Sequence, residues 1–278
     1  MRVLAYYGKS DIRDEEWPRP KKIPQGSVRV AVRAVTLGEA ARSAYLSGGM
    51  AAPSPVGQYA AGIVEESAEE SFPRGTPVLL WSDDASRGGL AEESLVWPAE
   101  RICALPKALS YPEMTLLPLW AELLSALEGL PDGNGTVLGE GPQLEMIKAL
   151  TPHLGAELLP EGQEAAWTIL LRADDKLLEK AMMNTRPGGT ILILSTVPGA
   201  ALGNLPLALE KRFCFNFGAV CQKRTLEKVF SLTSQGGLSL VCGNKLFSWD
   251  QADEAFLELE KGSFVTLYQE SFDEPYFP

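Results

Sequence analysis

The clearest candidate for chemistry is the stretch 139–144, which reads Gly-Glu-Gly-Pro-Gln-Leu. It follows the short apolar run 136–138 and opens the segment 143–150, whose apolar residues recur at helical spacing. Nucleotide-binding folds place the motif G-x-G-x-x-G at such a strand-to-helix turn. Its first glycine permits the tight turn, and its second lets the backbone approach a pyrophosphate. The candidate cofactor-binding residues are therefore Gly139, Glu140, Gly141, Pro142 and Leu144.

Two residues of this turn depart from the motif. Leu144 stands where a third glycine would permit close packing, so its side chain must push the helix away or fill space left by a differently placed helix. Glu140 would place a negative charge beside a phosphate, at a helix end whose dipole favours anions. Two interpretations stay open: a turn that still binds a dinucleotide, and a structural connection inherited from a nucleotide-binding ancestor.

The segment after the turn is short for a dinucleotide-binding domain. Such domains place an Asp or Glu roughly twenty residues after the glycines, at the end of the second strand, to bind the adenosine ribose. Between the first helix and the apolar strand around Trp167 there is barely room for one short strand. Glu157 or Glu161 could supply the ribose carboxylate, but a solvated acidic loop is the favoured interpretation.

Composition excludes several classes of partner. The chain of 278 residues is long enough for two domains, and 45% hydrophobic with 22% charged residues is typical of a globular protein. A net charge of −11 without a basic cluster makes nucleic acid and anionic membranes poor partners. The first residues become charged before a signal-peptide core could form, and no apolar run is long enough to span a bilayer. We therefore expect a cytoplasmic protein.

The cysteines and the histidine offer little chemistry. Cys103, Cys214, Cys221 and Cys242 show no C-x-x-C spacing, and His153 is the only histidine. A structural zinc site needs closely spaced ligands, so we expect reduced thiols. A catalytic triad would have to use His153, which follows Pro152 near the end of a predicted helix.

The first third of the chain is strand-like. Short runs with β-branched or alternating apolar residues are separated by proline and glycine turns. The expected strands lie within 2–7, 27–35, 57–67, 76–82 and 90–98. From Ser110, which can cap a helix, apolar residues recur at helical spacing to Leu130. Beyond this helix, apolar strands such as 190–195 alternate with helices, which predicts a parallel sheet covered on both faces.

Four stretches resemble, in collinear order, the medium-chain dehydrogenase/reductase family, which includes zinc alcohol dehydrogenases and zinc-free quinone reductases. These stretches are 57–66, 88–119, 186–194 and 247–262. The resemblance implies an α/β fold with a GroES-like β domain, formed by 1–110 plus 248–278. A truncated Rossmann-type domain with a doubly wound parallel sheet would span 111–247. NAD or NADP is the implied cofactor.

The resemblance also predicts that zinc is absent. Zinc-dependent members carry their catalytic ligands at positions that correspond to Gly38, Gln58, Tyr59 and the vicinity of Leu117. None of these residues supplies the thiolate, imidazole or carboxylate that zinc needs. The lobe that binds structural zinc in relatives would lie within 81–88, where only a short segment is present.

Three functions follow from the resemblance and its departures. The first is zinc-independent, NAD(P)-linked reduction of a small carbonyl or enone, with this small-molecule ligand in the interdomain cleft beside Gln58, Tyr59 and Trp120. Tyr59 could donate a proton there, although an aromatic residue packed in the β domain is the simpler interpretation. The second is a homologue that has lost dinucleotide binding and acts as a binding or assembly module. The third is a non-redox enzyme that uses Glu39 or Glu122.

The resemblance further implies a homodimer. Family members extend the sheet of the cofactor domain across a two-fold axis. The edge strand that would do so is expected near 239–247, and light scattering of the purified protein would test the dimer.

Overall fold

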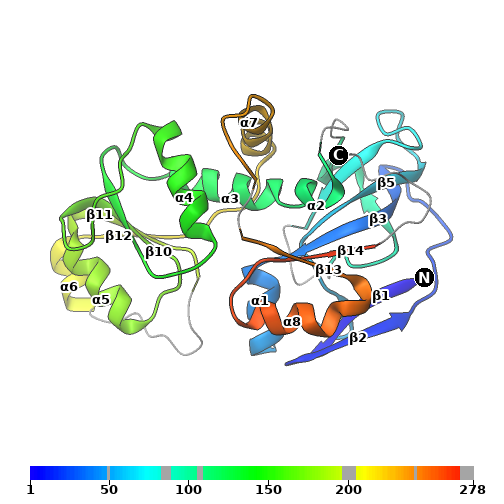
Figure 1. Cartoon of the computed structure of the whole chain (residues 1–278), viewed down its shortest axis with the longest axis horizontal. Coiled ribbons are helices and arrows are strands. Elements are labelled where there is room, and N and C mark those ends of the chain that lie inside the picture. The colour runs from blue at the N-terminus through cyan, green and yellow to red at the C-terminus, as the bar shows by residue number, and fades with distance from the viewer. Residues whose placement is uncertain (49–50, 83–88, 105–108, 196–204, 241–242, 270–278) are drawn as a thin grey trace. The chain divides into compact units, whose positions relative to one another are not determined.

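The computed structural model describes residues 1–48, 51–82, 89–104, 109–195, 205–240 and 243–269. The chain forms two compact units (Figure 1). One, called here the β unit, comprises Met1–Leu119 and Gly243–Pro278, and the other, the α/β unit, comprises Trp120–Cys242. No described helix has both the length and the apolar character needed to cross a bilayer.

The β unit contains two sheets. The larger has the strand order β13-β14-β3-β5-β6-β8 with β7 paired to β3, and the smaller has the order β2-β1-β4. All of these pairings are antiparallel except that of β13 with β14. The elements are β1 (Arg2–Gly8), β2 (Asp11–Glu16), β3 (Ser27–Leu37), α1 (Glu39–Ser47), β4 (Ser54–Pro55), β5 (Tyr59–Ser67), β6 (Pro77–Trp81), β7 (Ser94–Pro98), β8 (Ile102–Ala104), α2 (Tyr111–Met114), β13 (Lys245–Ser248), α8 (Ala252–Glu260) and β14 (Val265–Tyr268).

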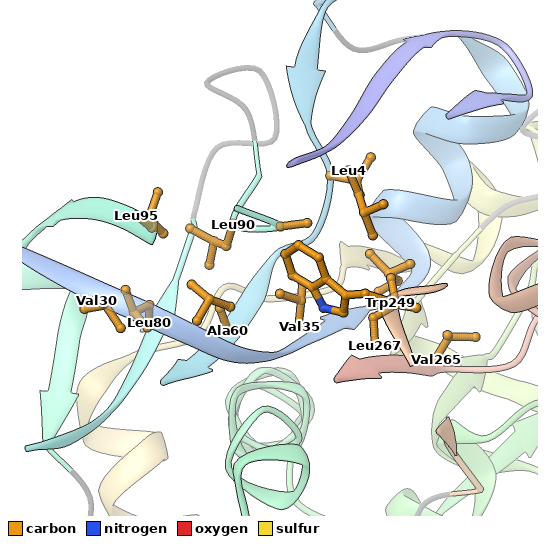
Figure 2. Packing of buried hydrophobic residues seen from close by; sticks show 14 of the residues in the cluster. Leu4, Val30, Val35, Ala60, Leu80, Leu90, Leu95, Trp249, Val265 and Leu267 are labelled. Atoms are coloured by element: carbon orange, nitrogen blue, oxygen red, sulfur yellow. The ribbon is translucent and has the colours of Figure 1, made fainter. Parts of the chain in front are cut away.

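The core of the β unit joins both ends of its sequence. Figure 2 shows the indole of Trp249 among Leu4, Val35, Leu90 and Leu267. Trp249 is 2% exposed and directly follows β13. The C-terminal segment therefore contributes a large side chain to a core that is made mainly by N-terminal strands. Burying such apolar area is the main favourable term in folding.

The helix predicted from Ser110 to Leu130 is broken in the structure. Ser110 caps α2 with a capping box in which Glu113 is the reciprocal partner, as expected for a Ser-x-x-Glu sequence. α2 ends at Met114, and α3 (Leu117–Glu128) begins beside Pro118. Proline has no N–H to donate to a preceding carbonyl, and it disfavours helical geometry in the residue before it. One helix therefore ends before Pro118, and a new helix begins beside it.

The α/β unit is a four-stranded parallel sheet with helices. Its strand order is β12-β11-β10-β9. All six residues of β10 are buried, as expected for a strand covered on both faces. Besides α3, the elements are β9 (Gly135–Leu138), α4 (Gln143–Leu150), β10 (Ala165–Leu170), α5 (Asp175–Asn184), β11 (Thr185–Ile193), α6 (Leu205–Lys211), β12 (Cys214–Phe217) and α7 (Lys223–Ser234). α5 lies against β9, β10 and β11, and α6 against β11 (Figure 1).

The described residues of the expected dimer strand near 239–247 do not extend the parallel sheet. Lys245–Ser248 forms β13, which pairs with β14 in the β unit. Among the described residues, the outer strand of the parallel sheet next to β11 is β12. The family resemblance placed a strand here but could not show which sheet it joins in this chain, because strand pairing is decided by long-range contacts. Homodimerisation itself stays a prediction.

Glu92 gives the β unit a predicted dependence on pH. It forms an isolated bridge with Val3, and burial raises the pKa of its carboxyl to about 7 from the ordinary 4.5. Folding therefore favours the neutral carboxyl. The stabilising contribution is complete below pH 4.5 and is lost as pH rises through 7. We expect the Glu92 contribution to the free energy of unfolding to fall by about 3 kcal/mol between pH 4 and pH 9.

The Glu92 effect can be measured by denaturant unfolding at both pH values. Glu92→Gln should remove this contribution, so the stability difference between variant and wild type should change with pH. Glu100→Gln, at an exposed position, is the control and should follow the wild-type profile. Parallel profiles for wild type and Glu92→Gln would refute the assignment.

Candidate functional site

The glycine turn lies at the carboxyl end of β9, where doubly wound sheets bind ligands. Gly139 has φ +99°, a conformation that other residues rarely adopt. A Cβ at this position would lie 3.6 Å from Leu171 Cβ and 3.7 Å from the backbone nitrogen of Arg172, so the turn lies against the end of β10. Gly139 therefore meets the requirement of the first motif glycine.

The remaining turn residues give a weaker site. A Cβ on Gly141 would meet only the Oε1 of Gln143, at 2.8 Å, and this flexible amide could move aside. α4 starts with Pro142 as its N-cap and has no capping side chain. Glu140 is exposed, and Leu144 is partly buried. The turn thus presents backbone N–H groups at a helix start together with a carboxylate that repels anions.

In the described part of the chain, the sheet beside this turn has four strands where the usual arrangement has six. A complete dinucleotide-binding sheet has the order 3-2-1-4-5-6, in which the first strand is flanked by the second and the fourth. Here β9 pairs directly with β10, and the described order β9-β10-β11-β12 corresponds to 1-4-5-6. Residues 139–164, all of which the structure describes, contain α4, the 3-10 helix at Thr151–Leu154 and one isolated bridge.

That isolated bridge marks the position of the second strand. Leu158 bridges Gly135 in parallel, with hydrogen bonds from Gly135 N to Glu157 O of 3.1 Å and from Leu159 N to Gly135 O of 2.7 Å. Glu157 is exposed, and its backbone nitrogen donates to Asn134 Oδ1. The carboxylate of Glu161 forms an ion pair with Lys180. The second strand is thus reduced to one residue pair, and one of the two candidate ribose carboxylates is paired with a lysine.

Arg172 is a residue of this region that the sequence analysis did not identify. It follows β10 by two residues, and its backbone lies against the glycine turn. Its Nε is buried, and within the described chain it has no hydrogen-bond partner. The sequence does contain a signal for this residue. An arginine directly after the strand-forming run 168–171 stands at the ligand-binding edge of a parallel sheet.

Hydroxyl groups occupy the interior of the β unit near the positions expected to correspond to zinc ligands. Thr36 is directly opposite Tyr59 in the pairing of β3 with β5. Thr36 Oγ1 lies 2.6 Å from Thr115 Oγ1 and 2.7 Å from Thr266 Oγ1. Since the Thr115 hydroxyl donates to the Pro112 carbonyl at 2.7 Å, the Thr36 hydroxyl donates to Thr115 and Thr266 donates to Thr36. Each of these buried hydroxyl groups therefore has a partner.

The four residues at the positions of the zinc ligands lie in the β unit, and none carries a thiol, imidazole or carboxylate. Gly38 is the N-cap of α1, and a Cβ there would lie 3.3 Å from Leu119 Cδ2. The backbone of Gln58 bonds to Thr36 and Ser82, and Leu117 is fully buried in α3. Within the described ranges, no three His, Cys, Asp or Glu side chains are grouped so that they could hold a metal ion.

The residues expected to line a substrate cleft are divided between the two units, so neither unit contains all of them. Gln58 and Tyr59 belong to the β unit, and Trp120 begins the α/β unit. Tyr59 and Trp120 are each 1% exposed. The role of Tyr59 as a proton donor stays a prediction, as does the cleft. Of the two alternative carboxylates, Glu39 forms an ion pair with the buried Arg42 at 3.1 Å, which is a structural role, and Glu122 is half-buried in α3.

The cysteines and the histidine form no catalytic arrangement in the described chain. Cys103, Cys214 and Cys221 form no disulfide within the described chain, and Cys242 lies outside the described residues. His153 is exposed in the 3-10 helix after α4, where a Cβ on Gly237 would lie 3.9 Å from its ring. The glycine turn and the end of β10 therefore remain the principal candidate site.

No family model and no curated protein matches the sequence. Solved structures match over nearly the whole chain. 2R,3R-butanediol dehydrogenase from Bacillus subtilis is 20% identical, with a TM-score of 0.77 over 97% of this chain and 99% of that one. An alcohol dehydrogenase from E. coli CFT073 in complex with NADH is 14% identical, with a TM-score of 0.79 over 96% and 99%. S. aureus TarJ in complex with NADPH is 14% identical, with a TM-score of 0.75 over 97% and 99%.

These similarities agree with the fold predicted from the four collinear stretches. The β unit corresponds to the GroES-like part and the four-stranded parallel sheet to the Rossmann-type part. At these identities the comparison establishes architecture, and function must be argued from the site. The chain therefore has the two-part α/β fold of the medium-chain dehydrogenase/reductase family, with a shortened Rossmann-type sheet.

Proposed function

We propose that this protein is a zinc-independent homologue of the medium-chain dehydrogenases that has lost dinucleotide binding and acts as a binding or assembly module. The observation that carries the proposal lies on the side of β9 away from β10, where the Gly135–Leu158 bridge is the only pairing among the described residues. The adenosine ribose of NAD or NADP is normally held at the end of the strand that should lie there. Without that strand, the part of the site that would contact the adenosine half of a dinucleotide is missing.

The turn itself supports the same proposal. Glu140 is exposed at the start of α4, where the pyrophosphate would lie, and its charge opposes binding of that group. Glu161 is paired with Lys180, so recruiting it for a ribose hydroxyl would first require breaking that ion pair. The residues present therefore do not fit a complete dinucleotide.

Zinc independence is proposed from the chemistry of the side chains at the corresponding positions. Gly38 and Leu117 have no donor atom, and Gln58 and Tyr59 offer only an amide and a phenol. Zinc in proteins is held by thiolate, imidazole or carboxylate groups. We expect the protein, purified without chelators, to contain zinc well below one atom per chain by elemental analysis. Stoichiometric zinc would contradict the proposal.

The loss of dinucleotide binding can be tested by titration with NADH and NADPH. Cofactor fluorescence and the thermal unfolding temperature should show no saturable change at millimolar concentration, because a ligand that binds only the folded state must stabilise it. A useful variant is Glu140→Gly combined with Leu144→Gly, which restores the glycine motif. It should also fail to bind, because the adjoining strand is still missing. Saturable binding by the wild type would refute the proposal, and binding by this variant alone would assign the loss to the turn.

A second candidate function is NAD(P)-linked reduction of a small carbonyl or enone without zinc. Gly139 keeps the left-handed turn of a dinucleotide site, and two solved structures with this fold contain NADH or NADPH. In this case the cofactor would supply the hydride and the protein would orient it. NADH oxidation in the presence of simple enones and aldehydes would support this candidate over the first.

A further inference from the structure

A groove on the β unit combines charges that the proposed function does not use. Its volume is about 830 Å³, within the range of small-molecule sites, and it lies between the segment 18–21, β3, β5 and the turn before β6. Four of its lining residues are cationic and two are acidic, in a chain whose net charge is −11. The charged lining residues are Arg19, Lys21, Arg29, Arg74, Glu65 and Glu66.

Two of the cations are neutralised and fixed in place. Arg29 is 12% exposed, with Nη1 donating to Glu66 at 2.7 Å and Nη2 donating to the Pro20 carbonyl at 2.7 Å. Arg19 pairs with Glu65, and its Nε donates to Ser94 Oγ at 3.1 Å. These contacts join the segment 18–21 to β5 and β7. The walls of the groove are therefore held in position by hydrogen bonds.

The other two cations form no ion pair among the described residues. Lys21 and Arg74 are exposed, and neither forms an ion pair with any carboxylate in the described part of the chain. After the two internal ion pairs are subtracted, the groove carries two positive charges. Pro18 and Pro20 add apolar surface to its lining. A ligand that suits this lining carries two negative charges on a short carbon skeleton.

We propose that this groove binds a small dianion, such as a phosphate monoester or a dicarboxylate, with Lys21 and Arg74 as the groups that pair with its charge. Arg19 and Arg29 act as positioning residues that hold the walls. This site lies entirely in the β unit and is independent of the glycine turn. Its presence or absence is therefore distinguishable from the loss of dinucleotide binding.

The test uses the full chain and two probes, glycerol 3-phosphate and succinate, with glycerol as the uncharged control. Binding is measured by calorimetry at low ionic strength, and its location by amide chemical-shift changes. At least one dianion should bind saturably, shift amides of residues 18–21 and 74, and weaken as salt is added. Saturation by the phosphate alone or by the dicarboxylate alone supports the site and identifies the anion.

Charge-removing variants locate the site. Lys21→Gln and Arg74→Gln should each raise the dissociation constant about fivefold. Lys22→Gln is the matched control, because Lys22 is also exposed and adjacent to Lys21 but does not line the groove. Equal weakening by Lys22→Gln, shifts confined to other residues, or no saturable binding by either dianion would overturn the proposal.

Discussion

Gly135→Ala should destabilise the α/β unit by about 3 kcal/mol, because a side chain at this position overlaps a buried indole. A Cβ there would lie 1.9 to 2.1 Å from three ring atoms of Trp167. Trp167 is 3% exposed, and its Nε1 donates to the Gly133 carbonyl at 2.9 Å. Moving the ring would break this hydrogen bond and disturb the pairing of β9 with β10. Denaturant unfolding followed by fluorescence measures the effect.

Two further variants isolate the steric cause of the Gly135→Ala effect. In a Trp167→Ala background the penalty of Gly135→Ala should fall below about 1 kcal/mol, because the ring that it meets is gone. Gly129→Ala is the control, since the nearest atom to its Cβ would be a carbonyl oxygen at 3.5 Å. If the penalty is the same with and without the Trp167 indole, the overlap does not explain it.

Trp249→Ala should cost about 3 to 5 kcal/mol of unfolding free energy, because it leaves a large cavity in the core of the β unit. The indole is 2% exposed and packs against strands from both ends of the sequence (Figure 2). Its Nε1 has no hydrogen-bond partner among the described residues. Trp249→Phe should therefore be much milder, since it removes volume but breaks no hydrogen bond in the described chain.

The control for Trp249→Ala is Leu257→Ala on α8, where the leucine is 56% exposed. Its effect should stay near zero, because little apolar area is buried there. A cost for Leu257→Ala comparable with that for Trp249→Ala would mean that the C-terminal segment as a whole, and not the indole, stabilises the unit.

Much of the β unit could be predicted from its sequence, because alternating apolar residues mark strands that are buried on one face. β3, β5 and β7 lie within or close to the expected ranges. β2 could not be predicted this way, since its sequence Asp-Ile-Arg-Asp-Glu-Glu is mostly charged and it lies at an exposed edge. The pairing of β13 with β14 could not be predicted either, because local sequence does not specify which sheet a short strand joins.

The candidate site was predictable in its local part and not in its long-range part. The requirement for glycine at 139 followed from the turn motif, and the structure gives it φ +99°. The short distance in sequence to Trp167 indicated barely room for one short strand, and the structure has a single isolated bridge at Leu158 in this segment. The proximity of Arg172 to the turn depends on the pairing of β9 with β10, which sequence spacing does not reveal.

The most direct test of the central claim uses ADP-ribose, which contains the adenosine half of the dinucleotide without the nicotinamide. Saturation-transfer NMR reports whether the adenine protons contact the protein. The E. coli alcohol dehydrogenase solved with NADH serves as the positive control. We predict no transfer to adenine from this protein, because the strand that would flank β9 and bind the ribose is reduced to one bridge. Transfer that saturates with ADP-ribose and is displaced by NADH would contradict the account.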